Sequence, residues 1–160
     1  MLETANSAIH IASTIVPLHN DSVLLPNACI DEIFKVEHIK PIKQKLSWCP
    51  GFVDFKGEII MLISLENIEN KIEVSQAESN IAIKIKKTEE FSNLPNIAIL
   101  AANTPHTLQA SDYSLDKEYS PSSTHPLARC YVNIKEKQSF IPDLPRLYTE
   151  FASQIQDIPN

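Results

Sequence analysis

The chain has 160 residues, which suits one domain or two half-size lobes with a common core and is too short for a large multidomain enzyme. Its 14 Lys and Arg residues against 20 Asp and Glu residues give a net charge of −6, which argues against nucleic acid or anionic lipid as a partner. Neither a leader sequence nor an apolar run of membrane-spanning length is present, so we expect a cytoplasmic protein without membrane insertion. Three Cys residues without paired spacing argue against a disulfide framework.

The first part of the chain predicts a β-hairpin followed by a helical turn. Residues 9–17 are rich in Ile, Val and Thr, residues 20–22 have turn chemistry, and residues 23–25 begin a partner strand. Asn27 is a competent helix N-cap, so residues 27–34 predict a short helical turn.

A second hairpin is predicted around the chain's two glycines, Gly51 and Gly57. Apolar residues alternate with polar ones over 52–55, and residues 59–63 form a second apolar run. Glycine tolerates the positive φ that hairpin turns need, so the turn is expected at Lys56–Gly57, with Lys56 exposed at the tip.

The middle of the chain predicts two further strands. Residues 65–71 have the spacing of one or two helical turns, and residues 81–85 alternate strongly, which predicts a strand with Lys84 and Lys86 facing water. The continuous apolar run 96–102 predicts a strand buried on both faces.

The last part of the chain predicts a mobile loop, a hairpin and a closing helix. Proline and small hydroxyl residues over 111–126 predict the loop, and residues 129–134 and 138–141 predict the hairpin. Asp143 is the expected N-cap of an amphipathic helix. So many short strands predict a mainly β protein, either one barrel or a pair.

Catalytic, cofactor and metal sites are all disfavoured by the residues. The best nucleophile candidates are Cys49, followed by Pro50, and Cys130 with His125, but an inert cysteine is the more common case. The His residues lack metal-ligand spacing, and two glycines cannot build a phosphate-binding loop. We therefore expect a binding or scaffold protein and not an enzyme, with a small cysteine-dependent hydrolase as the alternative from another class.

Several blocks of the sequence resemble the CheW-like coupling domains of bacterial chemosensory systems. The match runs from about residue 9 to residue 151 and rests on blocks at Leu25–Pro26, 30–33, 51–65, 131–134 and 140–147. The resemblance implies a mainly β fold of two small five-stranded SH3-like β-barrels that share a hydrophobic core, with a few short helices. It also implies a single CheW-like domain over residues 1–160, with lobes intertwined along the chain.

The resemblance implies a role as well. CheW-like proteins are adaptors without cofactors that couple the cytoplasmic tip of a methyl-accepting chemoreceptor to the regulatory domain of a CheA-type histidine kinase in membrane-bound receptor arrays. Residues 24–28 and 48–51 are most similar to the variants of type IV pilus chemosensory systems, such as PilI and ChpC, which implies control of twitching motility. The alternative is a divergent CheW-like protein that binds another partner, or the receptor only, outside a ternary array.

The resemblance also assigns partner-binding positions. These are Ile30, Glu32, Phe55, Lys56 and Gly57. The chain departs from the family pattern at four places: Lys56 replaces the usual Arg, Met61 a Pro, Ser64 an Asp, and residues 98–102 lack the usual Gly and Asp. Lys has no planar fork of donors, so a bidentate salt bridge at the tip becomes a point-charge contact.

Overall fold

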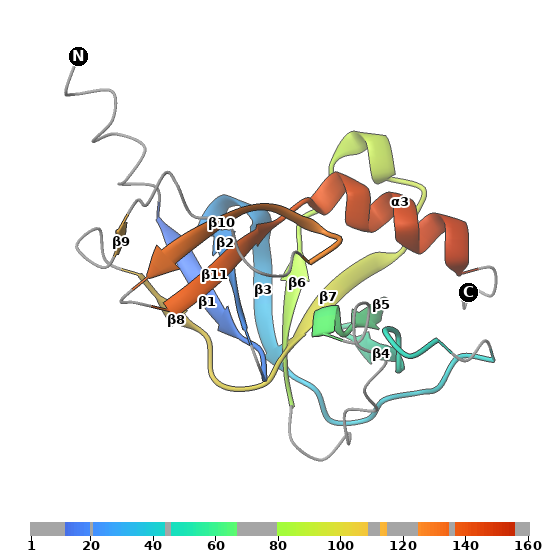
Figure 1. Cartoon of the computed structure of the whole chain (residues 1–160). Helices are drawn as coiled ribbons and strands as arrows, with labels where there is room; N and C mark the ends of the chain where they lie inside the picture. Colours follow the sequence, from blue (N-terminus) through green and yellow to red (C-terminus); the bar gives the residue numbers. More distant parts are fainter. Residues whose placement is uncertain are drawn as a thin grey trace.

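The structure is a computed structural model that describes residues 12–19, 21–43, 46–66, 80–108, 113–114, 125–134 and 137–155. These residues form two β-sheets and a C-terminal helix (Figure 1). The predicted helix over 65–71 and the predicted loop over 111–126 lie mostly outside the described residues.

The first sheet has six strands in the order β8-β1-β2-β11-β10-β9. Its strands are β1 (Ser13–Pro17), β2 (Ser22–Pro26), β8 (His106–Thr107), β9 (Tyr113–Ser114), β10 (Ala128–Ile134) and β11 (Lys137–Pro142). The first and last predicted hairpins are confirmed as β1–β2 and β10–β11, and β11 runs parallel to β2 where the two hairpins meet. The strands β8 and β9, each of two residues, form the edges of this sheet.

The second sheet has five strands in the order β3-β6-β7-β5-β4. Its strands are β3 (Ile30–Lys35), β4 (Gly51–Phe55), β5 (Glu58–Ile63), β6 (Ile81–Ile85) and β7 (Asn96–Ala101). The predicted hairpin at the two glycines is confirmed as β4–β5, and the buried strand predicted at 96–102 is confirmed as β7 in the middle of the sheet. Two short 3₁₀ helices, η1 (Asn27–Cys29) and η2 (Glu89–Phe91), lie in the connections.

The second sheet closes on itself as a barrel. Its edge strands are β3 and β4, and the chain that follows β3 crosses over to pair with β4. Lys40 and Phe52 exchange both backbone hydrogen bonds there, each 2.8 Å long. The two ends of the sheet are thereby joined along a seam, which leaves fewer unpaired backbone groups at its edges.

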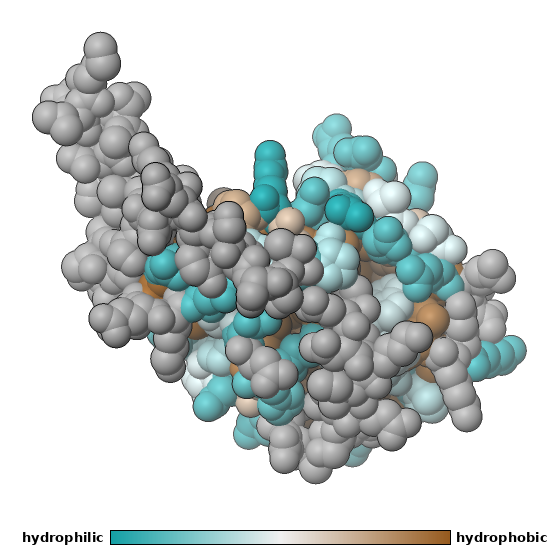
Figure 2. Space-filling model, in the orientation of Figure 1, coloured by the Kyte–Doolittle hydropathy of each residue, from teal (hydrophilic) through white to brown (hydrophobic). Residues whose placement is uncertain are grey.

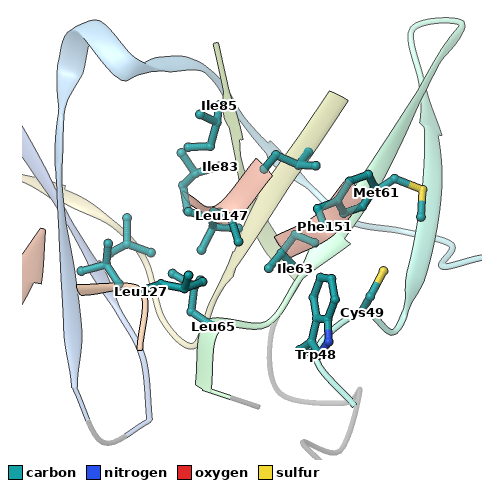
Figure 3. Close-up of a cluster of buried hydrophobic side chains, with 14 of the residues drawn as sticks. Trp48, Cys49, Met61, Ile63, Leu65, Ile83, Ile85, Leu127, Leu147 and Phe151 are labelled. Atoms are coloured by element: carbon teal, nitrogen blue, oxygen red, sulfur yellow. The ribbon is translucent and has the colours of Figure 1, made fainter. Parts of the chain in front are cut away.

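Among the described residues, three groups of apolar side chains fill the fold. One lies inside the closed sheet and includes Phe34, Val53 and Ile60, and another belongs to the first sheet and includes Ile15 and Leu24. The largest group contains side chains from both sheets and from the helix. Its labelled members in Figure 3 are Trp48, Cys49, Met61, Ile63, Leu65, Ile83, Ile85, Leu127, Leu147 and Phe151. The two sheets therefore share a core, as the predicted pair of barrels requires.

The helix α3 (Leu144–Gln154) follows the last strand of the first sheet and packs beside the second. Asp143 is its N-cap, as predicted, and accepts a hydrogen bond of 3.1 Å from the backbone N–H of Arg146. The buried face carries Leu147, Tyr148 and Phe151. Because α3 continues one sheet and packs against the other, it ties the two together.

Two expectations from the sequence are wrong. Helical geometry stops at Cys29, and Ile30–Lys35 is the strand β3, because β6 offers it a hydrogen-bonding edge. Asn27 is not a helix cap: its side-chain oxygen accepts a hydrogen bond of 2.7 Å from the Thr14 hydroxyl. Lys86 is exposed as predicted, but the side chain of Lys84 is only 12% exposed, because it lies between two carboxylates.

Candidate functional site

The turn between β4 and β5 presents one cation to solvent in a strained backbone conformation. Lys56 has φ of 54° and Gly57 has φ of 80°, so both central residues lie in the left-handed region, as in a type I′ turn. Glycine adopts this region without strain, whereas a lysine there is disfavoured. The Lys56 side chain is 69% exposed. The predicted tip is therefore confirmed, and it holds a charged residue in a position that suits Gly or Asn better.

An ion pair joins the tip to the opposite edge strand of the closed sheet. The ammonium Nζ of Lys56 lies 2.7 Å from Oε1 of Glu32 on the opposite edge strand and 5.1 Å from the ring centroid of Phe55. The rings of Phe55 and Phe34 stack at 4.3 Å with 19° between their planes. Glu32, Phe55, Lys56 and Gly57 therefore come together as one surface, an exposed ion pair above two stacked rings.

Ile30 occupies a different environment from the tip residues. It is half-buried, packs against the shared core, and lies opposite Ile85 in the sheet. The exposed large apolar residue of β3 is instead Ile33, at 46%. Among the predicted partner-binding residues, Ile30 thus has the contacts of a structural residue.

Sequence reasoning missed a second ionic group beside the tip. The register of β3 and β6 shifts between Ile30 and Glu32, which makes Asp31 the extra residue of a β-bulge. The Lys84 ammonium lies 3.0 Å from Oδ2 of Asp31 and 2.9 Å from Oε2 of Glu58. Asn96 donates a further hydrogen bond of 3.2 Å to Glu58. We call Asp31, Glu32, Lys56, Glu58 and Lys84 the seam cluster.

The seam cluster is held together electrostatically. The hydrogen bond to Glu58 raises the pKa of Lys84 above its usual 10.5, burial opposes that rise, and Asp31 adds to it. Lys84 therefore stays charged and ties β3 to β5 across β6 and β7. No local signal marks it, because Asp31 and Glu58 reach Lys84 only through long-range strand pairing.

Of the candidate nucleophile and base residues, Cys49 and His125 have the environments of structural residues, whereas Cys130 is exposed. Cys49 is 2% exposed, and burial raises the pKa of its thiol from 9.0 to about 11, a rise that hydrogen bonding with the backbone of Gly51 partly opposes. Both ring nitrogens of His125 are engaged: Nδ1 accepts from the Leu127 N–H at 3.0 Å, so Nε2 donates to the Leu65 carbonyl at 2.8 Å. A thiol that resists ionisation at neutral pH is a poor nucleophile.

We predict that Cys49 makes the fold less stable in alkali. The folded state favours the neutral thiol, so its contribution is complete below pH 9.0 and falls as the pH rises to about 11. The loss is expected to be about 3 kcal/mol. Urea unfolding between pH 9 and about 11 should show that the free energy of unfolding declines less with pH in Cys49→Ala than in the unmodified chain. The matched control is Cys130→Ala, which removes an exposed thiol, and an identical decline in all three proteins would contradict the prediction.

The described ranges contain neither a metal-ligand cluster nor a membrane-spanning helix. No group of three or more His, Cys, Asp or Glu side chains there is arranged to hold a metal ion. None of the helices in the described part of the chain is both long and apolar enough to cross a membrane.

Two β-sheets with a shared core, one of them closed into a barrel by a seam, and a helix that joins them define a two-lobed, mainly β fold. Residues 14–151 match the model of the CheW-like domain, so the chain belongs to the CheW-like domain family. Among solved structures, it is similar to the scaffolding protein TtCheW from Thermoanaerobacter tengcongensis, with a TM-score of 0.61, 15% identity and coverage of 83% of this chain and 84% of that one. No curated protein matches the chain significantly. The family match and the structural likeness confirm the predicted fold class, mainly β with two sheets around a shared core, although the first sheet has six described strands in place of five.

Proposed function

We propose that this chain is a non-enzymatic chemosensory adaptor that couples a methyl-accepting chemoreceptor to a CheA-type histidine kinase. Family membership and the likeness to a scaffolding protein support this role. The buried, weakly acidic thiol of Cys49 and the fully engaged ring of His125 favour a protein that works by binding. In this proposal, residues 1–160 act as one unit in the cytoplasm, at membrane-bound receptor arrays.

The observation that carries the proposal is the backbone of Lys56. A residue other than glycine at a φ of 54° is strained, and such strain in native proteins clusters at functional sites. Asn-Gly would form the same turn more easily, so fold stability does not explain the lysine. We propose that Glu32, Phe55, Lys56 and Gly57 contact the receptor tip or the kinase regulatory domain, with Ile30 supporting β3 from the core side.

The proposed setting is a type IV pilus system. The support is the sequence of two blocks, 24–28 and 48–51, which resemble the variants of those systems. The second block is well anchored in this chain: Trp48 packs edge-on to Phe151 at 6.4 Å, and its indole N–H donates to Gln154 at 3.2 Å. These contacts link the approach to β4 with α3.

We predict that reversing the charges of the tip pair weakens partner binding without unfolding the protein. Lys56→Ala or Glu32→Ala alone should weaken binding by about 0.5 to 2 kcal/mol, because both groups are exposed and screened by solvent. The double variant Lys56→Glu with Glu32→Lys keeps an ion pair within the chain but exchanges the positions of its two charges. A partner that is complementary to the original charges is then repelled, so the loss of binding free energy should exceed that of either single variant. Calorimetry with a receptor-tip fragment and a kinase regulatory domain from the same organism, at two salt concentrations, measures these losses.

Thermal melting of each variant provides the folding control, and Lys35→Gln, an exposed change elsewhere on β3, should bind normally. Normal affinity of the charge-reversed double variant for both partners would move the interface away from the tip. Binding of the unmodified chain to the receptor fragment with none to the kinase domain would favour an adaptor that works outside a ternary array.

A further inference from the structure

A groove separate from the seam cluster lies where the first sheet, the second sheet and α3 meet. Its volume is about 320 Å³. The end of β2 with η1, the chain just after β6, the start of β10, the end of β11 and the start of α3 together form its walls. No residue of the seam cluster lines it. The volume falls within the range of small-ligand sites, which begins at about 300 Å³.

The floor and walls of the groove are apolar. Leu25 and Tyr148, both almost fully buried, line it together with Phe91, Ile141 and Leu144. The Phe91 ring stacks on the Tyr148 ring at 4.9 Å with 12° between the planes, so one wall is a flat aromatic surface. Only small side chains stand at the η1 side, where Ala28 is exposed.

Among the described residues that line the groove, every charged one is a cation. These residues are Lys86, Lys87 and Arg129. The Lys87 ammonium donates hydrogen bonds to the backbone carbonyls of Leu94 and Ser92, at 2.7 and 3.5 Å. Lys86 and Arg129 are exposed and form no ion pair with any described residue. The chain as a whole has a net charge of −6, so the positive charge at the groove contrasts with the rest of the molecule.

We propose that the groove binds a small amphipathic anion, namely a carboxylate on an apolar chain or ring. The apolar floor would take the hydrocarbon part, because burial of each CH₂ group away from water favours binding. Lys86 and Arg129 would take the carboxylate at the mouth, where Arg129 can bind both oxygens. A volume of about 320 Å³ suits one such molecule better than a folded partner. A ligand at this place would contact both sheets and α3 at once, so it could influence how they are arranged.

The proposal is tested with decanoate as the probe and decyltrimethylammonium, of the same chain length and opposite charge, as its matched control. Calorimetry on the full chain should show decanoate binding below its micellar range and much weaker binding of the cation. The double variant Lys86→Gln with Arg129→Gln should bind decanoate about 10-fold more weakly, since it loses two partly exposed charge contacts. Ala28→Phe, which fills the groove from an exposed position, should also weaken binding.

Two controls separate this site from nonspecific binding and from the tip. Lys35→Gln removes an exposed cation outside the groove and should bind decanoate like the unmodified chain, as should the charge-reversed tip variant. Thermal melting checks that each variant is folded. Equal binding of the two detergents, unchanged binding in both groove variants, or no decanoate binding at millimolar concentration would each overturn the proposal.

Discussion

Replacing Gly51 with alanine should destabilise the folded chain by about 3 kcal/mol or more. A β-carbon at this position would lie 2.2 Å from the carbonyl oxygen of Lys40 and 2.9 Å from Cγ2 of Ile39. The Lys40 backbone cannot move away easily, because it exchanges two hydrogen bonds with Phe52 across the seam. The substitution therefore forces the seam of the closed sheet to open. Urea unfolding measures the loss.

The other glycine provides the matched control. A β-carbon at Gly57 meets no atom within 4 Å, so alanine there meets only the strain of its φ of 80°. We expect Gly57→Ala to cost about 1 to 2 kcal/mol, and Gly57→Val more because valine is β-branched. If Gly51→Ala proved no more damaging than Gly57→Ala, the close approach of Lys40 would not be what requires a glycine at position 51.

The parts of the fold that could be predicted from the sequence are those with local signals. The β4–β5 hairpin follows from two glycines around alternating residues, and α3 follows from an N-cap with apolar residues at helical spacing. Residues 30–34 form a strand although the sequence predicts a helical turn there, because their acidic residues also suit the first turn of a helix. Its strand state depends on pairing with β6, which lies far away in sequence. Closure through Lys40 and Phe52 is likewise a long-range event.

The candidate site likewise has residues that local sequence signals predict and contacts that only long-range strand pairing creates. Lys56 could be placed at an exposed tip because its turn is local, and the resemblance to a family then supplied Glu32 as a second position. The contact between the two, across opposite edge strands, follows from barrel closure. Around Lys84 the sequence shows only the alternation of apolar and polar residues, which predicts that Lys84 lies on the polar face of a strand. It does not predict the carboxylates that neighbouring strands bring to Lys84.

Changing Ile30 to aspartate should unfold the protein or lower its free energy of unfolding by about 3 kcal/mol. Ile30 packs against the shared core, and its strand neighbour Ile85 is fully buried, so the new carboxylate would lie in an apolar environment. Partner binding would then be lost together with the fold. Urea unfolding followed by calorimetry with the receptor and kinase fragments separates the two effects.

Ile33 is the control that decides how Ile30 acts. It lies on the same strand but is 46% exposed, so Ile33→Asp should keep a nearly normal free energy of unfolding. Ile30→Val, which keeps an apolar side chain and removes one methylene, should cost about 1 kcal/mol and bind normally. A folded Ile30→Asp variant with a normal melting curve and no partner binding would contradict the structural role and make Ile30 a contact residue, because its side chain would then be needed at the interface and not in the core.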